Sequence, residues 1–278
     1  ITSRLVGSEM CIRDRFLAAC STENEAAVEA TETEAENTET EEQSPPYTEY
    51  MTCTPGTDFS DVTVAAMIDE WNDFEFAEGF WFSAGQDPVQ SVSLGGENVV
   101  YWQLVWASKE AAEAGWSDWA TNSDADQWRA KHASVMQCDG QGRRGYDFYF
   151  NPLGEEANWN RPTQWVTYGH QCKLNGEDGL ELLRSAVVAF NEYIVTANNP
   201  EPFTYGVMFH SGENPEPFSN YDFFWQNYYE NHADAETSYA RFAEAGADIQ
   251  AMFDAAATCE GPTASDSYQF YPDPDDEV

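Results

Sequence analysis

The histidines are the side chains best suited to acid–base or metal chemistry near neutral pH. There are four of them, His132, His170, His210 and His232. No pair shows the His-x-x-x-His or Glu-x-x-His spacing that places two metal ligands on one helix face, so we predict no metal site. An isolated histidine is more often a surface or satisfied core residue. His210 is the best candidate for a catalytic residue, because it ends an apolar predicted strand beside Gly212.

Two Trp-Gln pairs, Trp102-Gln103 and Trp225-Gln226, are the closest repeated polar features. A glutamine on an otherwise apolar strand must find a hydrogen-bond partner when buried, so Gln103 and Gln226 could orient a ligand. A bond to a facing loop is the alternative. The ten tryptophans could stack on a ligand, although their spacing also suits core packing. No phosphate loop, nucleophile elbow or catalytic cysteine context occurs, so we predict no cofactor from motifs.

The same unit occurs twice in the chain. In the first copy, Ala112, Trp116 and Trp119 follow Trp102 by 10, 14 and 17 residues. In the second copy, the residues at the same distances from Trp225 are Ala235, Tyr239 and Phe242. The copies also align at Cys53 with Cys172, Cys138 with Cys259 and Tyr146 with Tyr268. A unit of roughly a hundred residues can form its own core, so this is a domain duplication rather than a solenoid.

Hydrophobic spacing predicts the same order of elements in each copy. In residues 47–152 we expect strands at 47–52, 80–83, 99–107 and 146–150, with helices at 60–74, after a Ser108 cap, and through 128–135. In residues 165–272 we expect strands at 165–171, 205–210, 223–229 and 267–271, a helix containing Leu183 to Ile194, and a second helix capped by Asn231. The order βαββαβ is that of a ferredoxin-like unit, so we expect an α+β fold of two such units.

Four cysteines remain for disulfides once Cys11 and Cys20 are set aside, and four allow three connectivities. The pairing that respects the repeat is Cys53–Cys138 and Cys172–Cys259. In a ferredoxin-like sheet the first and last strands are antiparallel neighbours, which brings these positions together. Such bonds indicate an oxidising compartment.

Both faces of the predicted strands are apolar, which is unexpected for a sheet with one wet face. In 99–107, Val100, Trp102 and Leu104 alternate with Val99, Tyr101 and Val105. The simplest cover for the second face is the other unit. Two units with facing sheets resemble the dimeric α/β-barrel superfamily, here fused in one chain over residues 47–271.

That resemblance implies a pocket between sheet and helices but transfers no catalytic pattern. The superfamily includes cofactor-independent monooxygenases, haem-binding or haem-degrading enzymes, isomerases and proteins without a known reaction. The Asn, Trp and His combination of the haem-degrading type cannot be placed on this sequence residue by residue. Haem therefore stays open as a cofactor.

The N-terminal segments carry no fold signal. Residues 1–15 resemble translated sequencing-adapter read-through. Residues 16–20 end in Leu17-Ala18-Ala19-Cys20, which looks like a bacterial lipoprotein box and makes Cys20 the expected lipidation site. Residues 21–46, rich in Glu and Thr, are expected to be a disordered tether. Residues 153–164 are expected to link the units, and 273–278 form an acidic tail.

The net charge of −38 decides which partners are expected. Nucleic-acid binding needs clustered Lys and Arg, so no nucleic-acid partner is expected. Contact with a membrane is expected only through the lipid anchor, in the bacterial cell envelope at the outer membrane or the periplasmic face. The leading hypothesis is a lipid-anchored binding or accessory protein for a small molecule. A cofactor-free oxygenase or isomerase and a structural envelope protein are the alternatives.

Overall fold

The computed structural model describes residues 45–90, 92–150, 159, 162–196 and 201–273. Residues 1–15, the lipoprotein box with Cys20, nearly all of the 21–46 tether, and most of 153–164 and 273–278 lie outside the described residues. Within the described part, no helix has the length and apolar character needed to cross a membrane.

Each half follows the expected order with additions. The first half contains β1 (Tyr47–Pro55), α1 (Asp61–Asn72), β2 (Phe80–Pro88), β3 (Val92–Ser93), β4 (Gly96–Glu97), β5 (Val100–Trp106), α2 (Lys109–Thr121), α3 (Ser123–Lys131), β6 (Met136–Cys138) and β7 (Arg144–Phe150). The second contains β8 (Gln164–Leu174), α4 (Gly179–Thr196), β9 (Phe203–His210), the 3-10 turn η3 (Phe218–Asn220), β10 (Phe223–Tyr229), α5 (His232–Ala245), α6 (Ala247–Ala256) and β11 (Ala257–Tyr271).

Hydrogen-bonding caps fix the helix starts. The Ser108 hydroxyl accepts from the backbone N–H of Ala111, and the Asn231 side chain accepts from that of Asp234, as the sequence predicted. Several predicted boundaries were wrong, including the end of the strand expected at 80–83, which continues to Pro88. The helix expected to run through residue 135 ends at Lys131, and His132 is its C-cap residue. The last strand, expected at 267–271, begins ten residues earlier at Ala257, directly after α6.

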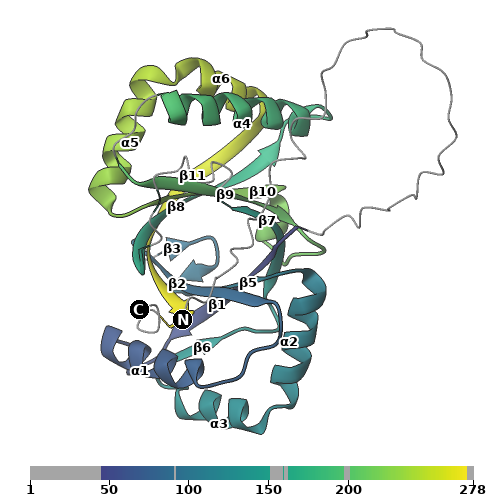
Figure 1. Cartoon of the computed structure of the whole chain (residues 1–278), viewed down its shortest axis with the longest axis vertical. Coiled ribbons are helices and arrows are strands. Elements are labelled where there is room, and N and C mark those ends of the chain that lie inside the picture. Colours follow the sequence, from purple (N-terminus) through teal and green to yellow (C-terminus); the bar gives the residue numbers. More distant parts are fainter. Residues whose placement is uncertain (1–44, 91, 151–158, 160–161, 197–200, 274–278) are drawn as a thin grey trace, which may run out of the picture. The chain divides into compact units, whose positions relative to one another are not determined.

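The strands close into an antiparallel barrel of eight strands (Figure 1). The first half contributes β7-β1-β5-β2 and the second half β11-β8-β10-β9, each in that spatial order. The halves join where β2 pairs with β11 and β7 pairs with β9. The short strand β6 pairs with the far end of β1 outside this ring. The expected α+β class and facing sheets are therefore confirmed as a mixed α+β barrel.

Alternate residues on each strand face the helices or the barrel interior. On β5, Trp102 and Leu104 join the core beneath α1, α2 and α3, while Val105 packs inside the barrel with Tyr50 and Met208. Helices α4, α5 and α6 cover the second half's strands in the same manner (Figure 1). Both strand faces are thus buried, as their apolar character predicted.

Both expected disulfides are present in the structure. Cys53 on β1 lies opposite Cys138 on β6, and Cys172 on β8 lies opposite Cys259 on β11. The bonds join residues 85 and 87 apart in sequence. The first bond ties β1 to the short strand β6, and the second ties β8 to the last strand, β11.

Removing one disulfide should destabilise the protein strongly, because a long loop is released in the unfolded chain. The variant Cys53→Ala/Cys138→Ala should lose about 4 kcal/mol of unfolding free energy in denaturant titration. Its symmetric counterpart, Cys172→Ala/Cys259→Ala, should lose a similar amount. An unfolding free energy equal to that of the wild type in both variants would contradict this arrangement.

Candidate functional site

A cavity of about 520 Å³ lies between the first half's strands and helices α1, α2 and α3. Its lining is dominated by aromatic rings, including six of the ten tryptophans: Trp71, Trp102, Trp106, Trp116, Trp119 and Trp128. Met51, Met67 and Met136 fill gaps between them, and polar groups at its border include Glu75, Asp118 and Arg129. We call this cavity the aromatic pocket. Its size and apolar lining are those of a small-molecule site.

Helix α1, which lines the aromatic pocket, is shorter than its counterpart α4 in the second half. Trp71 on α1 and Phe190 on α4 occupy matching places, each 18 residues after the first disulfide cysteine of its half. Both halves keep the next ring pair, since Phe74 lies 5.2 Å from Trp119 and Tyr193 lies 5.5 Å from Phe242. Helix α1 ends at Asn72, whereas α4 continues to Thr196. The segment after α1 instead supplies pocket-lining side chains.

The matching residue in the second half, Phe190, lies in an aromatic core cluster. The ring of Phe190 lies 5.5 to 6.2 Å, centroid to centroid, from five other aromatic rings. Trp225 stacks on Tyr205 at 4.4 Å, with only 7° between the ring planes. Both halves therefore have an aromatic core beneath their helices, and in the first half this core also borders the aromatic pocket.

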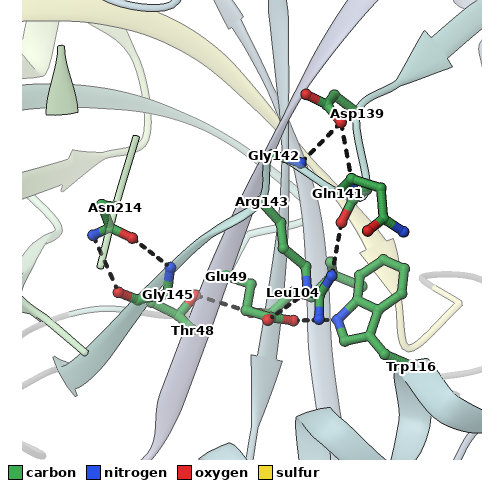
Figure 2. A network of polar contacts seen from close by, with 11 residues as sticks. Thr48, Glu49, Leu104, Trp116, Asp139, Gln141, Gly142, Arg143, Gly145 and Asn214 are labelled. Carbon is green, nitrogen blue, oxygen red and sulfur yellow. Dashed lines mark hydrogen bonds and ion pairs between the residues drawn. The ribbon is translucent and has the colours of Figure 1, made fainter. Parts of the chain in front are cut away.

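A buried carboxylate supports the pocket wall from behind. Glu49 on β1 is 3% exposed, accepts a hydrogen bond from the indole N–H of Trp116, and pairs with the Arg143 guanidinium at 2.9 Å (Figure 2). Arg143 also lies 4.5 Å from the centroid of the Trp116 ring and donates to the Gly140 carbonyl. These contacts fix the Trp116 ring, which lines the pocket, in one orientation. Glu49 is thus a positioning residue for that ring.

The same network extends along the strand that holds Arg143. Asp139 accepts from the backbone N–H groups of Gln141 and Gly142, which shapes the turn before Arg143 (Figure 2). Two residues after Arg143, the backbone N–H and carbonyl of Gly145 form hydrogen bonds with the Asn214 side chain of the second half (Figure 2). A Cβ at Gly145 would lie 1.8 Å from the Tyr47 hydroxyl, so the close approach there requires glycine.

His132 is the one histidine in the pocket lining. It is 7% exposed, its ring lies 5.5 Å from that of Trp128, and its Nε2 atom is 2.9 Å from the Glu70 carboxylate. Hydrogen bonds from Lys131 and then from His132 lower the pKa of Glu70. Because Nε2 is already engaged, the pocket does not fit a haem whose iron is bound through that nitrogen. The described residues contain no cluster of three or more metal-ligating side chains.

The structure separates the two Trp-Gln pairs. Trp102 lines the aromatic pocket and donates its indole N–H to Ser83 at 2.7 Å. Gln103 points the other way and donates to Thr48 inside the barrel. Trp225 packs in the second core and donates to Asn227.

Gln226, like Gln103, faces the barrel interior. Its carbonyl accepts from the hydroxyls of Tyr50 and Tyr228. Of the four predicted ligand contacts, only Trp102 therefore lines the large cavity. The period of a strand places Trp and Gln neighbours on opposite faces.

His210 ends β9 on the inner face of the barrel, away from the aromatic pocket lining. Its ring lies against Tyr146 and Phe224, its Nε2 atom is buried without a hydrogen-bond partner in the described part, and burial lowers its pKa against the opposing effect of Asp222. A catalytic role for His210 stays a prediction.

The other two histidines, His170 and His232, also belong to the second half. His170 Nε2 lies 3.1 Å from the Tyr239 hydroxyl. The same hydroxyl accepts a hydrogen bond from the Asn227 side chain. Burial lowers the pKa of His170 to about 4, which keeps it neutral as a hydrogen-bond acceptor. His232 bridges the Tyr168 hydroxyl and Asp266. Neither residue lines the aromatic pocket.

The comparisons with known proteins show a similarity of backbone structure only. No protein-family model and no curated protein matches the sequence. A proposed monooxygenase from Lactobacillus acidophilus NCFM matches with a TM-score of 0.49 at 11% identity, over 81% of this chain and 94% of that one. An anthrone oxidase-like protein matches with 0.47 at 11% over 80% and 90%, and a chlorite dismutase variant from Candidatus Nitrospira defluvii with 0.47 at 10% over 82% and 93%. At these values the matches assign no function.

The pH dependence of stability should reveal the buried Glu49. Burial raises its pKa above the ordinary 4.5, outweighing the opposing effects of Trp116 and Arg143. The folded protein therefore holds this proton more tightly than the unfolded chain does, so the stability from Glu49 is full below pH 4.5 and falls as pH rises towards the folded-state pKa. The variant Glu49→Gln cannot ionise and should lack this fall.

The measurement is urea unfolding of wild type and Glu49→Gln between pH 4 and 7. The wild type should lose up to about 1.4 kcal/mol relative to the variant for each unit by which the pKa is raised, on top of a constant offset from the lost Arg143 pair. The exposed Glu236→Gln is the control for loss of a surface carboxylate. A pH-independent difference between wild type and Glu49→Gln would show that this carboxyl has no raised pKa.

Proposed function

We propose that the protein is a lipid-anchored binding or accessory protein that holds a flat, apolar small molecule in the aromatic pocket of its first half. The observation that carries this proposal is the cavity of about 520 Å³ lined by six tryptophans. Indole rings offer wide apolar faces for stacking on a planar ligand. A core with no ligand to bind would be expected to fill such a space, as Phe190 helps to do in the second half.

The anchoring part of the proposal rests on other features. Cys20 follows the lipoprotein-like box, and residues 21–46 have the composition of a tether. The two disulfides fit an oxidising compartment such as the bacterial cell envelope. We further propose that the two halves are fused ferredoxin-like units, a view supported by their matching strand orders.

A cofactor-free oxygenase or isomerase is the second candidate. It is favoured by Glu49, a buried carboxyl with a raised pKa beside a wall of the pocket. Glu49 itself does not line the cavity, however, because Trp116 stands on that wall. The geometry therefore supports binding better than proton transfer. A purely structural envelope protein is the third candidate, and the test below separates it from the first.

Matched tryptophan substitutions test the binding proposal. Trp102 and Trp225 stand at equivalent places in the repeat, are 4% and 8% exposed, and each donate one indole hydrogen bond. Nile red, an uncharged planar dye, is the probe, and its fluorescence on titration with protein gives the affinity. Trp102→Phe should weaken dye binding by about ten-fold, as expected for loss of roughly 1.4 kcal/mol of stacking and contact area.

The control is Trp225→Phe, which should leave dye affinity within about two-fold of wild type because Trp225 lies outside the pocket. Unfolding of both variants is measured alongside, so that loss of fold is separated from loss of binding. Saturable dye binding that neither substitution changes would place the dye elsewhere. No saturable binding to the folded wild type would favour the structural protein.

A further inference from the structure

Arg144 is a buried cation on the inner face of the barrel. It begins β7, is 3% exposed, and donates from Nη1 to the Thr52 hydroxyl at 2.7 Å. Its guanidinium carbon lies 3.8 Å from the centroid of the Phe218 ring and 5.4 Å from that of Tyr101. Its Nε atom is buried and has no hydrogen-bond partner among the described residues.

The missing partner is unexpected in so acidic a chain. The sequence has 50 acidic and 12 basic residues, yet none of the ion pairs found in the described part includes Arg144. Its neighbour Arg143, on the opposite face of the strand, pairs with buried Glu49. A buried charge without a counter-charge is costly, so a counter-ion from outside would be strongly favoured.

A cavity of about 70 Å³ adjoins this guanidinium. Its lining is rich in hydroxyl and amide groups, from Tyr50, Tyr146, Thr167, Ser265, Gln86 and Gln171. Burial raises the pKa of Tyr146 to about 12, which keeps its hydroxyl protonated as a donor. The Gln86 Nε2 atom is buried without a partner that meets hydrogen-bond geometry, which supplies a second donor facing the cavity.

We propose that Arg144 and Gln86 bind a small oxyanion, of the size of formate or acetate, inside the barrel. A planar guanidinium matches a carboxylate geometrically, with two parallel N–H···O bonds. The cavity volume limits the ligand to a few heavy atoms. Ser93 and Leu94 of the β3–β4 hairpin and Phe218 of η3 also line it, and the Tyr101 hydroxyl is held by Ser93 at 2.6 Å. This site is separate from the aromatic pocket and does not depend on its ligand.

Sodium formate is the probe, compared with sodium chloride at the same ionic strength. Formate should raise the melting temperature of the wild-type protein in a saturable way, beyond chloride, because it binds only the folded state. Arg144→Gln should weaken formate binding by about ten-fold or more, as expected for loss of a charged hydrogen-bond donor. The exposed Arg184→Gln on α4 is the matched control and should respond like wild type. Equal effects of formate and chloride on the wild type would overturn the proposal.

A second variant keeps the test decisive if Arg144→Gln does not fold. Gln86 pairs with Tyr101 across β2 and β5, so Gln86→Glu would place a carboxylate in the cavity beside the guanidinium. This variant should be as stable without formate as wild type is with it, and should gain nothing from added formate. If Gln86→Glu keeps the full formate response, the anion binds outside this cavity and the proposal fails. A wild-type response to formate equal to its response to chloride would mean that water fills the site, and the proposal would fail.

Discussion

Because the barrel is closed, both faces of each of its strands are buried, and the side chains on both faces must find packing or hydrogen-bond partners. An open sheet can turn one face to water, but each four-stranded half here has its helices on one side and the other half on the other. Alternation along β5 shows the result, with Trp102 towards the helices and Gln103 towards the barrel interior. The polar groups enclosed by the barrel need partners from both halves, as when Gln226 accepts from Tyr50. Fusion of the halves therefore fixes both the core and the polar interior.

The two helix-covered faces differ in their helices although they come from the same repeated unit. Trp71 and Phe190 occupy matched positions in the two copies of the repeat. Helix α4 extends to Thr196 and covers the aromatic core of the second half, whereas α1 ends at Asn72 and lines the aromatic pocket. A folded domain rarely keeps so large an apolar space without use, because close packing is worth several kcal/mol. The aromatic pocket is therefore where we expect an apolar small molecule to bind.

Much of the fold could be predicted from the sequence because it is encoded locally. The strand at Phe223–Tyr229, the caps at Ser108 and Asn231 and both cysteine pairs follow from periodicity, capping chemistry and the repeat. The site was much less predictable. Glu49 pairs with Arg143, which lies 94 residues further along the chain, and no local sequence pattern predicts such a pair. The pocket is lined by side chains from several strands and from α1, α2 and α3, and no local motif marks such an arrangement.

The location of ligand binding is the most direct test of this view of the molecule. The protein would be labelled with 5-fluorotryptophan, its fluorine resonances assigned by single Trp→Phe substitutions, and Nile red added in steps. The resonances of the pocket tryptophans, such as Trp102 and Trp116, should shift, while those of Trp165 and Trp225 stay in place. Shifts centred on Trp225, or equal shifts in both halves, would contradict a single pocket in the first half.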